Sequence, residues 1–226
     1  MNNTSIETPE ILEVWDWEHG LPTGETVARG IAHRDGIPHE AVHLWIVRNL
    51  EREPCLLFQL RASHKDTYPD CLDITVGGHV PYGFTGDKLL KEAREEIGIE
   101  PTTKDRIDLG WYRFEEREEG LFQREFQHVF LLNDERPMDE YRFNDGEVVG
   151  IFAVELRDLE LIMRGDGEPF NADGFTGGSM VRKSLGRGDF HPLLFSPSME
   201  QYMRVVIGAV KELADTGRVS IRMPEV

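Results

Sequence analysis

The chain has 226 residues, 39% hydrophobic and 30% charged, which suits one large globular domain or a domain with an extension. Its formal net charge of −17 argues against non-specific binding to nucleic acid or to an anionic membrane surface. Two cysteines argue against a disulfide framework. No apolar run approaches the roughly 20 residues that span a bilayer, and the first segment is polar, so we expect a cytoplasmic protein.

Two short strand patterns open the chain. Residues 11–17 alternate apolar and polar side chains, and a turn with Gly and Pro leads into a second strand over residues 26–32. Trp15 and Trp17 could stack on a ligand, but packing against the edge of a main domain is the interpretation that we favour. Residues 1–36 are therefore expected to form a small β extension of the domain that follows.

Strand patterns separated by polar turns make up much of the remaining chain. The first two flank the loop EREP and predict a hairpin, and a charged tip, EEREEG, separates two later ones. The expected strands cover residues 39–49, 55–61, 72–76, 107–114, 121–132 and 147–154, with a short one in the tail over residues 219–226.

Helical patterns lie between and after these strands. One follows the Gly-Gly pair of the sequence TVGGHV, another covers residues 156–163, and a capped amphipathic helix covers residues 196–216. Residues 164–190 hold seven glycines and little periodicity, so we expect a long loop without regular structure there. Strands around one helix and a closing helix indicate an α+β fold, a mixed sheet between helices, over residues 37–226.

The stretch TVGGHVPYGFTGDKLLKEAREEIGI carries the strongest chemical signal. Its helix places Glu92, Glu95 and Glu96 at i, i+3 and i+4, so the three carboxylates share one face. Like charges this close need a cation or a basic partner among them, and oxygen ligands suit a hard ion such as Mg²⁺. A solvated acidic face is the alternative, which the glycine turn before the helix and Gly98 after it disfavour.

This stretch resembles the Nudix box, G-x5-E-x7-R-E-U-x-E-E-x-G-U, in which U is an aliphatic residue. The match is carried by Glu92, Glu95, Glu96, Gly98 and Ile99. Lys91 replaces the Arg of the pattern, and Gly83 or Phe84, depending on the count, replaces its first Glu. The resemblance implies a Nudix-type α/β/α sandwich around a mixed sheet, with the metal-binding carboxylates retained.

The resemblance also implies an activity, which is hydrolysis of the diphosphate in a nucleoside-diphosphate-type compound with Mg²⁺ or Mn²⁺. Such an ion would neutralise the diphosphate and lower the pKa of a bound water, whose proton a nearby carboxylate would take. The implied metal ligands are Glu92, Glu95, Glu96 and the carbonyl of Gly78. The candidate catalytic residues are Glu95, which we favour as the base, with Glu96 and Glu147. The candidate substrate-binding residues are Arg61, Lys65 and His79.

Further segments resemble the isopentenyl-diphosphate isomerase branch of the same superfamily: AHRDGIPHEAVHLWIV, LLFQLRASHKDTYPDCLDITVGGHV and FSPSMEQYM. Those isomerases bind a divalent metal, and the matching positions here are His33, His39, His79 and Glu125. The place of their catalytic cysteine holds Gly77, which cannot move a proton to or from carbon, so isomerase activity is disfavoured. An isomerase and a non-catalytic nucleotide-binding module with a degenerate box remain the alternatives. Analogy favours a homodimer.

Overall fold

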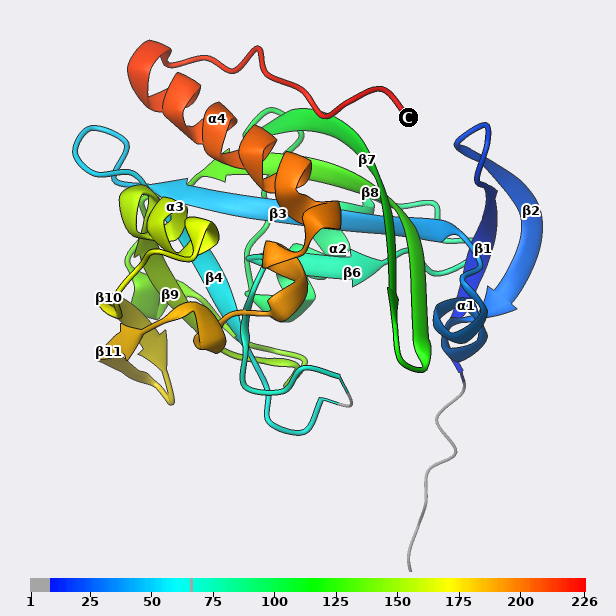
Figure 1. Cartoon of the computed structure of the whole chain (residues 1–226), viewed down its shortest axis with the longest axis horizontal. Helices are drawn as coiled ribbons and strands as arrows, with labels where there is room; N and C mark the ends of the chain where they lie inside the picture. Colours follow the sequence, from blue (N-terminus) through cyan, green and yellow to red (C-terminus); the bar gives the residue numbers. More distant parts are fainter. Residues whose placement is uncertain (1–8, 66) are drawn as a thin grey trace, which may run out of the picture.

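A nine-stranded mixed sheet is the centre of the computed structural model, which describes residues 9–65 and 67–226 (Figure 1). The strand order is β11-β10-β9-β4-β3-β8-β7, with β5 paired to β4 and β6 paired to β3. The strands are β3 (His39–Arg48), β4 (Cys55–Arg61), β5 (Leu72–Asp73), β6 (Val76–His79), β7 (Arg106–Glu118), β8 (Leu121–Asn133), β9 (Val148–Glu155), β10 (Phe170–Thr176) and β11 (Ser179–Leu185). The helices are α1 (Arg29–Asp35), α2 (Lys88–Glu96), α3 (Leu156–Arg164) and α4 (Glu200–Thr216). β3 pairs with β8 in parallel and with β4 and β6 in antiparallel fashion.

Apolar side chains cover both faces of this sheet. On one face Trp45 packs in a cluster with Met203 of α4, and on the other Leu44 packs with Leu89 of α2. Figure 1 shows α4 in front of β3 and α2 behind it. Because alternate residues of a strand point to opposite faces, a strand covered on both sides is buried throughout, as nine of the ten residues of β3 are. The predicted α+β sandwich is confirmed.

The glycine-rich segment over residues 164–190 differs from the loop that we expected. Its central part forms the antiparallel hairpin of β10 and β11, and Gly177 and Gly178 form the turn with φ of 58° and 74°. Positive φ at both turn residues matches the twist of a two-residue hairpin, and glycine adopts it without strain. The glycines therefore mark a tight turn between strands.

Both ends of the chain also differ in detail from the expected elements. The second N-terminal strand is β2 (Leu21–Ala28), and residues 29–32, expected to continue it, belong to α1. The closing helix predicted over residues 196–216 is a 3-10 turn at first and becomes α-helical at Glu200. The tail has no strand. None of the helices in the described part of the chain is long and apolar enough to cross a membrane.

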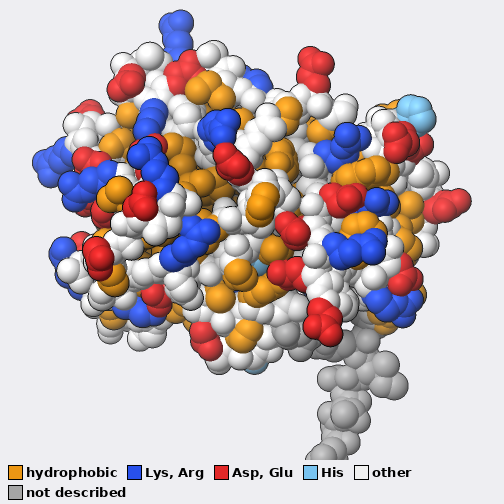
Figure 2. Space-filling view, viewed as in Figure 1, with side chains coloured by type: hydrophobic (Ala, Val, Ile, Leu, Met, Phe, Trp, Pro, Cys, Tyr) orange, Lys and Arg blue, Asp and Glu red, His pale blue; other side chains and the backbone are white. Residues whose placement is uncertain are grey.

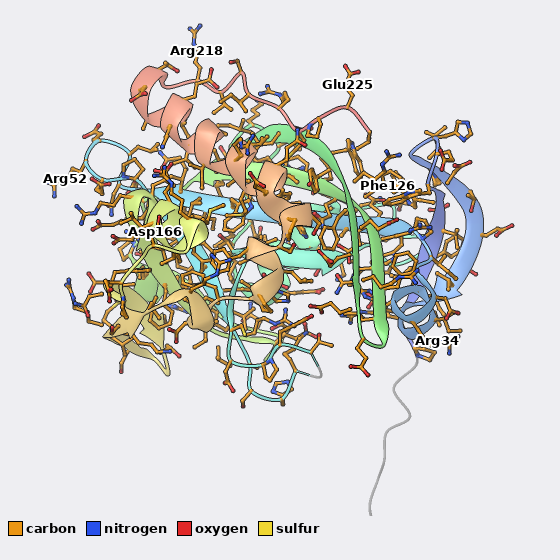
Figure 3. All side chains as sticks on the ribbon, in the orientation of Figure 1. Arg34, Arg52, Phe126, Asp166, Arg218 and Glu225 are labelled. Atoms are coloured by element: carbon orange, nitrogen blue, oxygen red, sulfur yellow. The ribbon has the colours of Figure 1, made fainter. Side chains whose placement is uncertain are left out.

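The segment before β3 packs on the end of the sheet. β1 (Ile11–Asp16) pairs with β2, and the ring of Trp15 lies 5.3 Å from the ring centres of both Trp111 and Phe126. Figure 3 shows Phe126 on the side of the sheet that carries this hairpin. The tryptophan thus packs against the edge of the main domain, the interpretation favoured from the sequence.

Helix α1 ends where the chain turns into β3. Gly36 closes the helix in the left-handed conformation, with φ of 69°, and a Cβ there would lie 2.1 Å from the ring of Phe122 on β8. The glycine therefore allows α1 to lie directly against the β7–β8 hairpin, where its side chains reach the cavity described below. On the face of the molecule in Figure 2, acidic and basic side chains are interspersed.

Candidate functional site

A cavity of about 1020 Å³ opens where β3 and β4 separate. The two strands pair only near one end, from Ile46 to Arg48 on β3, and beyond that point β6 lies beside β3 and β5 beside β4. Gly77, Gly78 and His79 of β6 line the cavity together with polar side chains from both flanking strands. Carboxylate and histidine clusters lie near the two ends of β6.

The first cluster contains Glu96 of the predicted acidic helix face. Glu96 is only 5% exposed, and its Oε2 accepts a hydrogen bond of 3.2 Å from the backbone N–H of Gly77. The ligand atoms of Glu96, Asp145 and Glu147 lie within 4.8 Å of one another, so the three carboxylates can share one ion. Burial, followed by the charge of Glu92, raises the pKa of Glu96 well above its ordinary value. A divalent cation would relieve this unfavourable charge, so the oxygen-only cluster fits Mg²⁺ or Mn²⁺.

Glu92 and Gly78 are in close contact. A Cβ built on Gly78 would lie 2.4 Å from the Cδ and Oε2 atoms of Glu92, so only glycine lets this carboxylate approach the strand. The Glu92 side chain is 12% exposed, and burial raises its pKa. Glu92 thus lies beside the Gly78 backbone, and their joint role as metal ligands stays a prediction.

Glu95 lies apart from the cluster of Glu96, Asp145 and Glu147. Its side chain is 49% exposed, and it accepts a hydrogen bond of 2.7 Å from Lys91, which also donates to Glu92 at 2.9 Å. Lys91, the departure from the Nudix pattern, therefore neutralises carboxylates of its own helix. Of the predicted catalytic residues, the structure brings Glu96 and Glu147 together and leaves Glu95 on the exposed side.

Asp145 is a cluster member that the sequence reasoning missed. The loop before β9 is tied to the end of α2, because the backbone N–H of Asn144 donates to the carbonyl of Glu95. Gly98 makes this approach possible, since a Cβ on it would lie 2.6 Å from Cβ of Arg142. The Asn-Asp-Gly-Glu sequence that precedes β9 contained a signal, an acidic pair two residues apart.

The predicted phosphate-binding side chains line the same cavity but have protein partners. Arg61 donates to Asp73 at 3.1 Å and also binds two carbonyls of the loop after β4. Lys65 donates to Glu147 at 2.5 Å. Burial would raise the pKa of Glu147, but the hydrogen bond from Lys65 and the positive charge of Lys65 together lower it. Both cations reduce the negative charge at this end of the cavity.

The second cluster consists of His33, His39, His79 and Glu125, whose ligand atoms also lie within 4.8 Å of one another. Strand register explains most of it: His39 of β3 is directly opposite Glu125 of β8, and His79 of β6 is opposite the next residue of β3 that points to the same face. Helix α1 supplies His33. The distance between the Nε2 atoms of His33 and His79 is 3.1 Å.

His39 offers this second cluster a free lone pair. Nδ1 of His39 donates to the carbonyl of Ile37, which leaves a lone pair on Nε2, a buried atom without a hydrogen-bond partner in the described residues. Burial lowers the pKa of His33 to about 3 and that of His39 to about 4. Although burial opposes it, the hydrogen bond from His79 lowers the pKa of Glu125 well below its ordinary value. Three imidazoles with one carboxylate are a donor set that fits a divalent first-row metal ion.

Comparison with known proteins assigns the family. Residues 37–174 match the model of the NUDIX domain. The chain belongs to the Nudix family. An uncharacterized Nudix hydrolase of Clostridium acetobutylicum is 26% identical over 208 residues, which cover 90% of this chain and 98% of that relative. Nudix hydrolase 3 of Arabidopsis thaliana is 37% identical over 125 residues, 53% of this chain and 16% of that protein.

A solved structure shows the same fold. DR0079 from Deinococcus radiodurans superposes with a TM-score of 0.53 at 18% identity, covering 70% of this chain and 91% of that one. Together with the named relatives, the family match makes this Nudix protein a hydrolase. The matched range contains all three carboxylates of the first cluster, Glu96, Asp145 and Glu147, but it begins after His33 of the second cluster.

Proposed function

We propose that this Nudix hydrolase cleaves the diphosphate of a nucleoside-diphosphate-type substrate with Mg²⁺ or Mn²⁺. The observation that supports this most is the grouping of Glu96, Asp145 and Glu147 beside the Gly77–Gly78 backbone. Glu92, Glu96 and the Gly78 carbonyl would hold the ion, whereas the Glu95 side chain is half exposed and bound to Lys91. When bound, the ion would supply charge neutralisation for the diphosphate and a water of lowered pKa.

The remaining roles follow from position in the cavity. Arg61, Lys65 and His79 line it and would meet phosphate oxygens, at which Arg and Lys form charge-assisted hydrogen bonds. Glu95 and Glu147 are the two candidates for the base that takes a proton from water. Glu147 has the stronger geometric support, because it lies within the carboxylate cluster and lines the cavity.

Activity on a panel of dinucleotides and nucleoside-diphosphate compounds tests this proposal. We expect the purified chain to release mononucleotide or phosphate with Mg²⁺ or Mn²⁺. Glu96→Gln should remove this activity while urea unfolding stays cooperative, and Glu95→Gln should be the milder variant if Glu147 is the base. A wild type that is inert on the whole panel with both metals contradicts the proposal. Tight nucleotide binding without metal binding would instead support a non-catalytic module.

The second cluster favours one other candidate function, an isomerase of prenyl diphosphates. The grouping of three histidines with Glu125 is the observation that supports it, and Gly77, in place of a proton-transferring side chain, opposes it. Incubation with isopentenyl diphosphate in heavy water gives the test. Allylic product or deuterium incorporation would support isomerisation, and the absence of both would exclude it.

Metal titration separates the two clusters. We expect each chain to bind two Mn²⁺ ions, one at each cluster. Glu96→Gln should remove one of these sites and His39→Ala the other. Loss of one site in both variants would mean that the clusters do not bind ions independently.

A further inference from the structure

His43 lies between the two clusters and has no role in either. It is on β3, directly opposite Gly77 of β6, whose backbone N–H binds Glu96 and whose second neighbour along the strand is His79. His43 is only 8% exposed and lines the cavity. A buried polar side chain in this apolar strand calls for an explanation in terms of its partners.

Hydrogen bonds behind His43 determine which ring nitrogen carries the proton. The indole N–H of Trp45, which can only donate, donates to the hydroxyl oxygen of Tyr202 at 2.9 Å. Tyr202 is fully buried, and its oxygen lies 3.0 Å from Nδ1 of His43. If Nδ1 carried a proton, the Tyr202 hydroxyl proton would be buried without an acceptor, at the cost of a lost hydrogen bond. The hydroxyl therefore donates to Nδ1, and the proton of the neutral ring is on Nε2.

The Nε2–H group is available to a ligand. It has no hydrogen-bond partner in the part of the chain that the structure describes, although the ring lines the cavity. Gly77 keeps it uncovered, because even a Cβ there would lie 3.9 Å from Nε2 and a longer side chain would extend over it. Burial lowers the pKa of His43 to about 4, so the ring stays neutral at neutral pH.

We propose that His43 positions the substrate by donating a hydrogen bond from Nε2 to a phosphoryl oxygen bound between the two clusters. This inference rests on the proposed diphosphate substrate. The two clusters lie near the two ends of β6, and Gly77 of this strand is opposite His43. A ligand with oxygens near both clusters would therefore pass His43. The role needs an acceptor atom on the ligand, and phosphoryl oxygens are strong acceptors. Tyr202 and Trp45 hold the ring in the donor tautomer.

Nitrogen-15 NMR of the full chain, with labelled histidine and Mg²⁺, tests the tautomer and the contact without catalysis. We expect His43 to be protonated on Nε2 alone, and its Nε2–H signal to shift when methylenediphosphonate is added. A proton on Nδ1, or an Nε2–H signal that does not move at saturating methylenediphosphonate, would overturn the proposal.

Two substitutions at His43 separate a positioning role from a structural one. His43→Gln keeps an N–H donor near the place of Nε2, and His43→Leu keeps volume without the donor. We expect the leucine variant to bind methylenediphosphonate about 10- to 100-fold more weakly, as for one hydrogen bond to a charged group, and the glutamine variant to restore most of that affinity. Equal weakening in both, or wild-type binding by the leucine variant, would refute the role.

The failure of this inference and the failure of the proposed function give different results. If no compound is hydrolysed but the Nε2–H signal responds to methylenediphosphonate, the hydrolase proposal fails and the His43 contact stands. If hydrolysis is found and His43→Leu is as active as wild type, the His43 proposal fails alone. Urea unfolding of both variants checks that each is folded.

Discussion

Replacing Gly78 by alanine tests the metal-binding role of Glu92. A Cβ at this position would lie 2.4 Å from Cδ of Glu92, whereas carbon atoms in ordinary contact are about 3.5–4.0 Å apart. The carboxylate must therefore move away by about 1 Å or more. Because the displaced atoms are at the end of a flexible side chain, the backbone can keep its place. The variant should thus lose a metal ligand and keep its fold.

Calorimetric titration with Mn²⁺ and urea unfolding measure the two effects separately. We expect the Mn²⁺ affinity of the Glu96 site to fall about 10- to 100-fold, the range seen when the support of a metal ligand is disturbed. The free energy of unfolding of the metal-free protein should change by less than about 1 kcal/mol. Where a substrate is known, a displacement of about 1 Å should also lower kcat/KM by roughly 100-fold.

Gly77→Ala is the matched control on the same strand. Its Cβ would lie 3.5 Å from Cδ2 of His43, an ordinary van der Waals contact, and its N–H to Glu96 remains. The Mn²⁺ affinity of this variant should stay near that of the wild type. Unchanged Mn²⁺ affinity in Gly78→Ala would show that Glu92 does not hold the ion, and equal losses in both variants would show that the argument from the Glu92 contact is wrong.

Four further predictions concern pH, metal and backbone. Unfolded histidine takes up a proton near pH 6.5 and buried His43 only near pH 4, so the unfolded state binds more protons between these values. Lowering the pH from 7 to 5 should therefore reduce the free energy of unfolding. Urea unfolding should show that this reduction is on the order of 2 kcal/mol larger in wild type than in His43→Gln. Glu96 has a raised pKa, so the folded metal-free chain retains a proton that the unfolded chain loses above about pH 4.5, and its stability relative to Glu96→Gln should fall as pH rises. Mg²⁺ at a hundred times its Kd should stabilise wild type by about 2.7 kcal/mol and leave Glu96→Gln nearly unchanged, and an equal Tm shift in both would contradict this. Gly98→Ala should destabilise the fold more than Gly120→Ala, since both have positive φ but only Gly98 adjoins another backbone, and equal urea midpoints would refute the steric part.

The fold was largely predictable because its central strands carry a strong apolar signal. The predicted strand over residues 55–61 has the bounds of β4, and the Nudix box placed α2. The elements that were wrong lie at the edges. Most residues of β2 and β11 are exposed, so neither strand shows the alternation that reveals a half-buried strand. The Pro and Gly of β2 and the Arg-Lys pair of β11 are also common in loops.

The candidate site was predictable where spacing on one element determines it. Glu92 and Glu96 are four residues apart, so one helix brings them to one face. Asp145 and His43 depend on long-range contacts, the docking of a loop on α2 and the register of β3 with β6, which a single sequence does not reveal. In the sequence, His43 is merely a polar interruption of a buried run, and Tyr202 is 159 residues away.

Helix α1 contributes to the cavity from outside the matched family domain. The family domain begins at residue 37, whereas His33 and the cavity-lining Arg29 come from the preceding helix. A Nudix chain without this helix could keep every carboxylate of the first cluster and lack one imidazole of the second. The carboxylate cluster is thus built within the matched domain, whereas the histidine cluster is complete only with the preceding helix, which Gly36 closes.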